Sequence, residues 1–540
     1  MPFHPIHLAQ TATARGWAKS VGTSAKDAQV INGLFEVATN PLLGTKTVYV
    51  AKRAGSSVAF SSVGSGVIAL KSPNSGIGTL YISDGSLSSS STVYGGVTSN
   101  PSAFTNYNVA DAIVGANNLL AFNTSSGGGF YLWENAISTN FPTFSGDTHT
   151  NTTIDNIAST TGLYPGQIIT GTGIQANTRI ATITSGTAIT TTIATTASAT
   201  ITITKQAVAK IIDADYPTSL LTGGIVQLDG YFFTADTDGN IYQSALNDPS
   251  SWAATDVLNA DYSGDGILFL FKIGNYIAAA GSGGTIQYFY NAGNPTGSVL
   301  SAAPNLTLSG IQINNSPVSM GGVFYCYAKT RIGSWGTTGL YRLSGVNTFE
   351  RVSDDIWSSI IVTLDLDLIS TATIGTKHLV VMHSSTDAVA VIYDPSVNMF
   401  SFLQLATAFT SSNATGSLFT RASSSDVLQW AVGNTWTDES VAYTLTIQTE
   451  PQDMNEGTDA TDTYVYLIAD NESTGTAALA YTDDDYANWN TVGSFDMTAT
   501  KKRVNGAGGQ HNLRAYRVTH SANTGFRGQM LRVKFEPGTD

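Results

Sequence analysis

Apolar residues recur along this chain in short runs that are rich in β-branched and aromatic residues and are bounded by Gly, Asn, Ser and Pro. Such runs between turn residues are typical of β-strands. Helical periodicity is nearly absent, and its best instance is SDDIWSSII, where Ser353 is placed to cap a first turn that carries Asp354 and Asp355. The pattern therefore predicts an all-β fold. Clear strand candidates are TVYVAKR from Thr47, YIAAAG from Tyr276, GVFYCYA from Gly322 and HLVVMH from His378.

A weak repeat appears when the strand candidates are aligned. Each unit has an apolar pair, a break that often contains Gly, an apolar strand, a polar turn and an aromatic-bearing strand. The units start at Val67, Leu119, Ile225, Ile267, Val318, Leu379 and Ser417. Most starts lie about 40–60 residues apart, as in a β-propeller of four-stranded blades, so we predict about six or seven blades. We assign 1–45 to an N-terminal arm and first strands, 46–435 to the propeller and 436–540 to a β-sandwich-like C-terminal domain.

One gap in the repeat is too long, because 106 residues separate Leu119 from Ile225. The excess coincides with a Thr-rich segment, 147–205, whose alternation of polar and apolar residues differs from that of its flanks. Removing this segment restores the spacing of a blade. We therefore predict a small β-domain inserted into a loop of the propeller, where insertions cost little.

The overall composition narrows the possible partners. Only 12% of the residues are charged, and 25 basic against 39 acidic residues give a net charge of −14. This sign argues against dedicated binding of nucleic acid. The one cysteine, Cys326, lies in an apolar run and is predicted to be a buried, inert thiol. No apolar run is long enough for a secretory signal or a membrane-spanning helix, so we expect the protein to be made in a cytoplasm.

Charge is divided unevenly near the end of the chain. Residues 422–500 contain 14 acidic residues and no Lys or Arg, whereas 501–540 contain eight basic and two acidic residues. Acidic and basic strands of one sandwich could face each other. Alternatively, the acidic flank of one subunit could meet the basic flank of the next, a head-to-tail contact that can close a ring. The second interpretation identifies four candidate subunit-interface residues, Arg503, Arg514, Arg517 and Arg527.

Two segments imitate ligand-binding motifs. The first, DTDGN at 236–240, resembles a calcium loop, but an EF-hand loop needs Gly at its sixth position and Glu at its twelfth, where this chain has Ile241 and Asn247. Its Asp-Gly pair instead predicts a hairpin turn. The second, TGTGIQA at 170–176, imitates a dinucleotide fingerprint but leads into a strand rather than a helix. We therefore predict no metal and no cofactor.

Catalytic arrangements are equally weak. TDDDYANW at 482–489 resembles a degenerate Asp-box, the turn found in sialidases and other propellers, but it lacks the usual Gly. A sialidase also needs several arginines around its substrate, and this chain has few. Carboxylate pairs could hydrolyse glycosides at suitable separations, yet turns at strand ends also collect Asp. We predict no enzymatic activity. The pairs are Asp213 with Asp215, Asp261 with Asp265, and Asp365 with Asp367.

Residues 29–55, QVINGLFEVATNPLLGTKTVYVAKRAG, resemble the opening of the tail nozzle proteins of short-tailed bacteriophages, also called packaged-DNA stabilisation proteins. Ala54 stands where that family's Lys-Arg-Pro-Gly-like turn has proline. In the centre, a Trp-bearing loop, a DGI start at 265–267, a GTIQYF strand at 284–289 and a later FERVSDDIWSSI segment follow the family's order. The resemblance covers most of the chain apart from the Thr-rich insertion. The matching N-terminal residues are Gln29, Asn32, Gly33, Glu36, Lys52, Arg53 and Gly55.

The resemblance implies a structural virion protein with a propeller body and an additional β-domain. Such a protein forms a homohexameric ring below the tail adaptor and portal, extends the DNA exit channel, and carries fibres or a tail needle or plug. It retains packaged DNA and passes it during ejection without sequence-specific binding, in a virion tail assembled in the host cytoplasm. Two alternatives remain open: a carbohydrate-binding or glycan-degrading tail or receptor-binding propeller, and a monomeric propeller scaffold of cellular origin.

Overall fold

The computed structural model describes most of the chain, with gaps concentrated between residues 61 and 142. The chain forms two compact units: the first contains Met1–Ser61, Ser353–Phe409 and Gly416–Asp540, and the second contains Ser62–Val352 and Thr410–Thr415. The described residues are 3–11, 28–39, 46–60, 70–71, 80–83, 86–89, 92–96, 110–114, 117–124, 128–133, 143–217, 224–260, 264–314, 317–332, 335–346, 348–384, 386–407, 418–420, 426–430, 435–484, 486–506 and 508–538.

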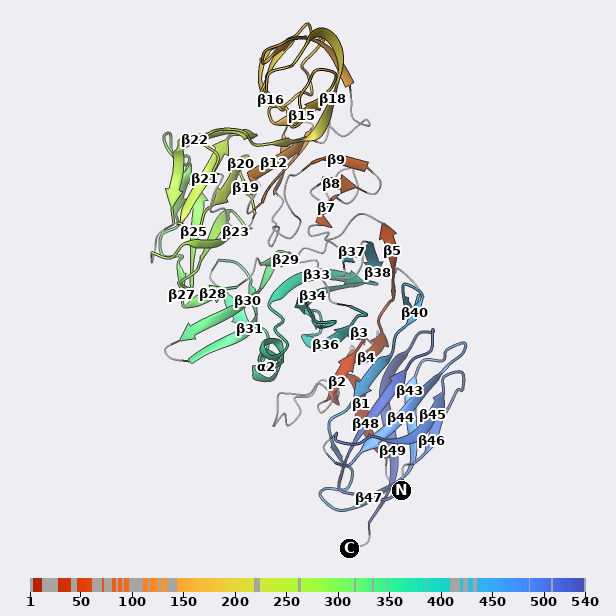
Figure 1. The fold of residues 1–540 in the computed structure, drawn as a ribbon. Helices are drawn as coiled ribbons and strands as arrows, with labels where there is room; N and C mark the ends of the chain where they lie inside the picture. The colour runs from red at the N-terminus through yellow and green to blue at the C-terminus, as the bar shows by residue number, and fades with distance from the viewer. Residues whose placement is uncertain are drawn as a thin grey trace. The chain divides into compact units, whose positions relative to one another are not determined.

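Strands make up nearly all of the regular structure in these ranges, which confirms the predicted all-β fold (Figure 1). The helices found there are α1 (Leu8–Thr11) and α2 (Asp355–Thr363). The predicted cap of α2, Ser353, is one residue too early, because Asp354 accepts the hydrogen bonds of the free N–H groups of Ile356 and Trp357. None of the described helices is long and apolar enough to cross a membrane.

The second unit is built mainly from small antiparallel sheets whose strands pair in chain order. This is the sheet type of propeller blades, in which each strand turns back beside the one before it. The sheets are β6 (Leu70–Lys71), β7 (Leu80–Ser83), β8 (Ser86–Ser89) and β9 (Thr92–Gly96); β19 (Val226–Leu228), β20 (Tyr231–Ala235), β21 (Asn240–Ala245) and β22 (Asp248–Asn259); β23 (Ile267–Ile273), β24 (Tyr276–Gly281), β25 (Thr285–Asn291) and β26 (Leu300–Ala302), with β27 (Leu308–Ser309); and β28 (Ile311–Ile313), β30 (Val323–Ile332), β31 (Trp335–Leu343) and β32 (Phe349–Arg351), with β29 (Val318–Met320).

A further blade-like sheet of the second unit carries the inserted domain. Its strands are β10 (Ala110–Val114), β11 (Asn117–Thr124), β12 (Gly128–Trp133) and β18 (Ser198–Lys210). The long strand β18 pairs with β12 near Lys210 and with β13 from Thr204 back to Ser198. The chain therefore returns from the insertion to the blade through one continuous strand. The other strands of the insertion are β13 (Thr143–His149), β14 (Thr153–Asp155), β15 (Gln167–Thr170), β16 (Ile180–Ser185) and β17 (Ala188–Thr191).

The inserted domain has a hydrophobic core of its own, composed almost entirely of isoleucine. On β18 the residues alternate, so that Ile201 and Ile203 face inward whereas Thr200 and Thr202 face solvent. This confirms the predicted small β-domain. The core residues are Ile154, Ile157, Leu163, Ile169, Ile180, Ile189, Ile201 and Ile203.

The first unit contains another antiparallel meander and a mixed sheet. In the mixed sheet, the N-terminal strand β5 joins strands that lie far later in the chain. Together with the sheets of the second unit, these sheets confirm the predicted propeller-like fold class. The meander contains β33 (Leu368–Ile374), β34 (Lys377–His383), β35 (Val389–Asp394) and β36 (Met399–Gln404). The mixed sheet contains β37 (Leu418–Thr420), β38 (Val427–Trp430), β5 (Ser56–Phe60), β39 (Thr437–Asp438) and β40 (Val441–Ala442).

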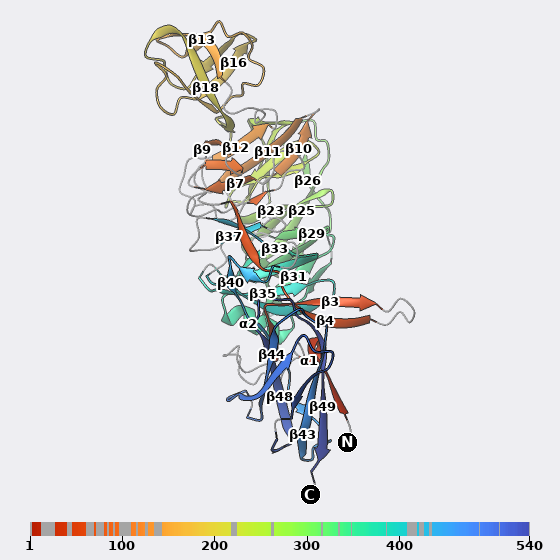
Figure 2. The same cartoon turned by 90° about the vertical axis from the view of Figure 1, so that its right-hand side faces the viewer.

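The end of the chain folds as a β-sandwich, as predicted. One sheet, called sheet 1 below, contains β1 (Phe3–His7), β3 (Gly33–Thr39), β4 (Lys46–Lys52), β43 (Ala460–Ala469), β46 (Lys502–Asn505), β47 (Gln510–His511) and β49 (Arg527–Pro537). The other, sheet 2, contains β2 (Gln29–Ile31), β41 (Leu445–Gln448), β42 (Gln452–Asp453), β44 (Thr476–Thr482), β45 (Asn490–Asp496) and β48 (Leu513–His520). Figure 2 shows β3 and β4 side by side, as their antiparallel register requires.

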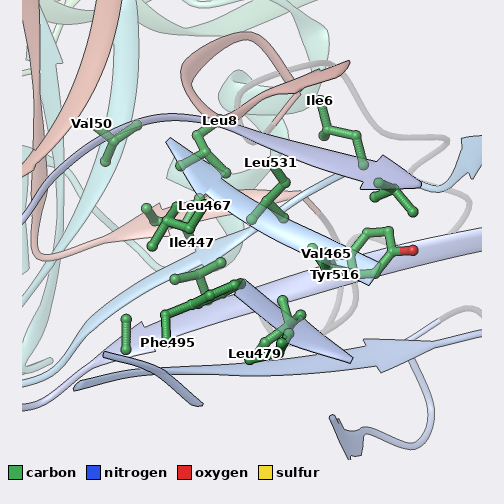
Figure 3. Packing of buried hydrophobic residues seen from close by; sticks show 14 of the residues in the cluster. Ile6, Leu8, Val50, Ile447, Val465, Leu467, Leu479, Phe495, Tyr516 and Leu531 are labelled. Atoms are coloured by element: carbon green, nitrogen blue, oxygen red, sulfur yellow. The ribbon is translucent and has the colours of Figure 1, made fainter. Parts of the chain in front are cut away.

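The core of the sandwich lies between these two sheets and includes side chains from both ends of the sequence. N-terminal residues pack against residues more than four hundred positions later, so the N-terminal strands are part of the core of the sandwich. Figure 3 shows part of this core, with the labelled side chains Ile6, Leu8, Val50, Ile447, Val465, Leu467, Leu479, Phe495, Tyr516 and Leu531.

The N-terminal residues that carry the family resemblance lie where the meander β33–β36 meets the sandwich. Strand β2 pairs in parallel with β36, through Ile31 and Phe402, and antiparallel with β41. One ten-stranded sheet therefore runs from the meander into sheet 2 of the sandwich. Immediately after β2, Asn32 adopts a left-handed backbone conformation with φ of 59°. Its side-chain oxygen accepts from Gln404 N at 3.0 Å and from Arg53 Nε at 3.1 Å.

Arg53 lies at the centre of this junction and is fully buried. Its guanidinium forms two hydrogen bonds with the Asp438 carboxylate and lies 3.8 Å from the centre of the Tyr443 ring. Gly55 follows closely, and a Cβ at that position would lie 2.0 Å from the carbonyl oxygen of Thr437. The residues that carry the resemblance therefore join the meander, the mixed sheet and the sandwich within the first unit.

Candidate interaction surface

The calcium-like loop at 236–240 is a closed hairpin turn between β20 and β21. Asp236 is buried, and its carboxylate accepts hydrogen bonds from the N–H groups of Asp238 at 3.0 Å and Asn240 at 2.9 Å. The side chains of Asn240 and Tyr242 occupy its other oxygen. The carboxylate thus holds the turn, which confirms the hairpin interpretation. Across the described ranges, no group of three or more His, Cys, Asp or Glu side chains is arranged to hold a metal ion.

Other acidic candidates also stabilise turns. Asp484, in the segment that resembles an Asp-box, accepts from the Thr482 hydroxyl at 2.6 Å and from Asn488 N at 2.9 Å. These hydrogen bonds lower the pKa of Asp484 to about 2. Asp213 accepts from the backbone N–H groups of Asp215 and Trp252. Each carboxylate therefore accepts hydrogen bonds from backbone N–H groups and has a structural role.

The structure describes the other two predicted carboxylate pairs to different extents. Asp265 accepts from Gly283 N at 2.7 Å, whereas its predicted partner Asp261 lies outside the described residues. Burial, and then the nearby charge of Asp365, raises the pKa of Asp367. Burial likewise raises the pKa of the Cys326 thiol to about 12, so that it stays protonated and inert at neutral pH, as predicted.

The glycine segment at 170–176 has no helix after it. Strand β15 ends at Thr170, a turn that includes Gly173 with φ of 77° follows, and β16 begins at Ile180. A dinucleotide fingerprint needs a helix N-terminus to receive the phosphates. The resemblance to that fingerprint is therefore accidental, as predicted.

Arg514, one of the four predicted interface arginines, lies inside the sandwich and is 1% exposed. Its guanidinium donates to Asp462 at 2.9 Å and forms two hydrogen bonds of 2.7 Å with Asp483. Because Arg514 belongs to sheet 2 and Asp462 to sheet 1, this ion pair connects the two sheets. The prediction that Arg514 lies at a subunit surface is therefore wrong. Because side chains alternate along β48, the side chain of Arg514 points inward, and acidic residues of the same chain neutralise its charge.

Asp462 has two further partners in the same buried cluster. His511 Nε2 lies 3.0 Å from one carboxylate oxygen, and the Tyr516 hydroxyl lies 2.5 Å from the other. Burial alone would raise the pKa of Asp462, but the hydrogen bonds from His511, Tyr516 and Arg514 together hold it below its usual value. Asp462 therefore lies at the centre of a buried network of charged and polar side chains.

Arg527 and Arg517 lie on opposite sheets of the sandwich. Arg527 donates to Glu36 at 2.7 Å and to Asp470 at 3.2 Å, and its guanidinium lies 3.9 Å from the Tyr49 ring centre. Arg517, on sheet 2, lies over the ring of Trp489 at 4.3 Å. The predicted arginines therefore do not form one surface, and Arg514 and Arg527 fit the interpretation in which acidic and basic strands of one sandwich face each other.

Arg503, the fourth predicted arginine, is exposed on the outer face of sheet 1. There Tyr466 on β43 lies opposite Arg503 on β46 and opposite Arg532 on β49. In the next row, Lys534 lies opposite both Tyr464 and Phe3. We call this surface the cationic face; it comprises Phe3, Tyr464, Tyr466, Arg503, Arg532 and Lys534.

The side chains of the cationic face contact one another. The Arg503 guanidinium lies 4.7 Å from the Tyr464 ring centre, and the Lys534 ammonium lies 5.8 Å from it. Phe3, 54% exposed, packs edge-on against Tyr466 at 6.0 Å. Cation–π contacts of this kind orient the charged groups without neutralising them.

The cations of this face have no acidic partner in the part of the chain that the structure describes. Glu536 is the acidic residue on the same strand, and it lies beyond Lys534, opposite Thr461. The sequence signal for the face is the alternation in YVY, at 464–466, and in RVK, at 532–534, which directs every second side chain outward. Counting charge alone does not reveal it, because the buried and exposed arginines contribute equally to the count.

Comparison with known proteins identifies no family. No protein-family profile matches the chain, and no curated protein matches its sequence. Among solved structures, the exo-β-1,3-galactanase of Phanerochaete chrysosporium aligns with a TM-score of 0.27 and 7% identity over 80% of this chain and 96% of its own. BamB from Moraxella catarrhalis aligns with a TM-score of 0.31 and 11% identity over 70% and 98%. The computationally designed Ika8 protein gives 0.33 and 10% over the same shares. At these scores the alignments carry no argument about function.

Proposed function

We propose that this chain is a structural subunit of a bacteriophage tail nozzle, which extends the DNA exit channel below the tail adaptor and portal. The observation that carries the proposal is the buried junction around Arg53. Asn32, Arg53 and Gly55 are residues on which the family resemblance rests, and all three fix the packing of the first unit. The resemblance therefore falls on residues that determine the architecture.

The construction of the first unit suits a mechanical role. A wall around pressurised DNA must transmit force without opening at a hinge between its parts. Here strand β2 carries the hydrogen-bonded sheet from the meander into the sandwich, and the buried Arg53–Asp438 pair fastens the mixed sheet beside it. Breaking such a buried pair on one side is costly, because it leaves an unpaired charge away from water.

The net charge of −14 also agrees with a channel through which DNA slides. Fixed negative charge repels phosphates within a Debye length of about 8–10 Å, so the wall does not retain the DNA by adhesion. In this role the chain acts as a homohexamer, contacts adaptor, portal and fibres or a tail needle, and has no catalytic task.

Binding to the adaptor tests this function. Purified chain is mixed with portal–adaptor complexes and the mixture is sedimented, with portal alone as the control. We expect saturable co-sedimentation that requires the adaptor and reaches six chains for each portal–adaptor complex, as the proposed homohexamer implies. A chain that stays monomeric at every ratio and never sediments with the complex contradicts the proposal.

A carbohydrate-binding role in a tail or receptor-binding protein is the second candidate. The aromatic rings of the cationic face favour it, since aromatic side chains beside cations are suited to acidic sugars. Binding to an array of acidic glycans that is lost when Tyr464 and Tyr466 are changed to Ala would support this alternative. An array without any bound glycan would argue against it.

A further inference from the structure

We propose that the cationic face of one copy of this chain binds an acidic loop on a second copy, in a head-to-tail contact. The inference rests on the proposed ring and names the surfaces that would close it. The acidic loop connects β42 to β43 and has the sequence DMNEGTD, 453–459, with Asp453, Glu456 and Asp459 as its charges. It contains no basic residue.

The acidic loop has a defined shape. The Asn455 N–H donates to Asp453 at 3.1 Å, the Thr458 N–H donates to the Asn455 carbonyl at 3.0 Å, and the Asn455 amide donates to the Asp459 carbonyl at 3.1 Å. Glu456, at the tip, has a positive φ of 49° and an exposed side chain. These bonds order the backbone, so the loop presents its carboxylates at little further entropic cost.

The acidic loop does not reach the cationic face of its own chain along β43. Five to seven residues separate Asp459 from Tyr464 and Tyr466 on the extended strand. At about 3.3 Å per residue, this places the loop about 17–23 Å from the centre of the face, beyond the range of an ion pair. The charges of the two surfaces are therefore available to a neighbouring copy.

Charge complementarity selects a second copy over other partners. The cationic face carries Arg503, Arg532 and Lys534, and the acidic loop carries an equal number of carboxylates. Different surfaces of one chain meet in such a contact, so the contact is heterologous and its repetition generates a ring. DNA is disfavoured because the remainder of the chain, residues 1–500, is strongly acidic, with 17 basic and 37 acidic residues.

The two kinds of side chain on the face have separate roles in the contact. Exposed ion pairs contribute little each, but complementary charges fix the orientation and accelerate association. Tyr464 and Tyr466 lie in the middle of the cations and bring buried apolar area to the centre, where interfaces concentrate their affinity. We therefore expect salt to weaken assembly, because it screens the charges. Truncation of the two tyrosines should also weaken assembly, because it removes apolar contact area.

The test is a charge-swap experiment on assembly with portal–adaptor complexes. Arg503→Glu/Arg532→Glu on the cationic face and Asp453→Lys/Glu456→Lys on the acidic loop are compared with Lys272→Glu/Lys329→Glu, which reverses two exposed cations elsewhere. We expect each of the first two variants to lose at least about tenfold in ring assembly, and their mixture to regain most of it. The control should assemble as the unmodified chain does. The changed residues are exposed, and Asp453→Lys removes one hydrogen bond of the loop, so all variants should stay folded, which thermal unfolding of each variant checks.

Each result distinguishes this inference from the proposed function. If the unmodified chain never joins the adaptor, the proposed function fails. If the unmodified chain assembles and the Arg503→Glu/Arg532→Glu variant assembles equally well, the ring stands and the cationic face is not its contact. The inference is also overturned if each swap abolishes assembly but the mixture does not recover, or if the face instead retains DNA or an acidic glycan on a column that the variant leaves empty.

Discussion

At the scale of single residues, two buried arginines determine how the first unit is held together. Arg53 faces Asp438 and Arg514 faces Asp462, and each guanidinium also lies over a tyrosine ring, Tyr443 in one case and Tyr481 in the other. Buried ion pairs gain little over an apolar substitute, but the loss of one partner leaves the other charge stranded. The positions are therefore sensitive to removal of one partner.

Replacement of Asp462 by Asn should destabilise the sandwich strongly. The change leaves Arg514 with Asp483 alone and removes the carboxylate that His511 and Tyr516 contact, so the free energy of unfolding should fall by about 3–5 kcal/mol. Asp470→Asn is the matched control, because Asp470 pairs with Arg527 at an exposed site and should contribute about 0–1 kcal/mol. Urea unfolding of both variants measures the difference, and equal losses would refute the buried-network interpretation.

His520 makes the stability of the sandwich depend on pH. Burial, and then the nearby charge of Lys52, lowers its pKa from 6.5 to about 4. The folded state favours the neutral ring, so its contribution to stability is present above pH 6.5 and is lost as the pH falls from 6.5 towards about 4.

The change His520→Gln tests this dependence. The variant should lose less stability than the unmodified chain when the pH is lowered through this window, whereas His378→Gln, at an exposed ring, should follow the unmodified chain. Thermal unfolding at a series of pH values gives the comparison. Parallel curves for the unmodified chain and His520→Gln would show that His520 is not the responsible group.

At the scale of elements, the short β-branched and aromatic runs predicted the all-β class, and the spacing of the repeat predicted the insertion, but neither could show which distant strands pair. Strand β5 lies in the mixed sheet between β38 and β39, more than three hundred residues later. Nothing local to a strand specifies such a partner, since edge hydrogen bonds are chemically alike. The predicted boundaries at 45/46 and 435/436 remain predictions. For the same reason the prediction of Arg514 as an interface residue was wrong, because the packing of sheet 1 determines which face of β48 is buried.

Gly55 is an element-scale test of this long-range pairing. Replacement by Ala should force the backbone near Thr437 apart and destabilise the first unit by about 1–3 kcal/mol or more, because overpacking a fixed backbone cannot be relieved by a rotamer change. Gly186→Ala, in a turn where an added Cβ has no neighbour within 4 Å, is the control. A stable Gly55→Ala chain with an unchanged unfolding temperature would contradict the close approach.

At the scale of the whole molecule, the distribution of charge is more informative than its sum. Arg514 in the interior of the sandwich and Arg527 at its surface pair with acidic residues of the same chain, whereas Arg503, Arg532 and Lys534 remain together on one face. Composition predicted that the basic tail takes part in a subunit contact, but not which of its basic residues lack an acidic partner among the described residues. That distinction depends on strand register, which assigns alternate residues to opposite faces.

The most direct test of the central claim is electron microscopy of portal–adaptor complexes after addition of the purified chain. We predict additional density below the adaptor, in the form of a ring that continues the central channel and whose subunits contact one another between the cationic face and the acidic loop. Complexes that remain unchanged, with the chain left as free monomers at saturating concentration, would contradict this prediction.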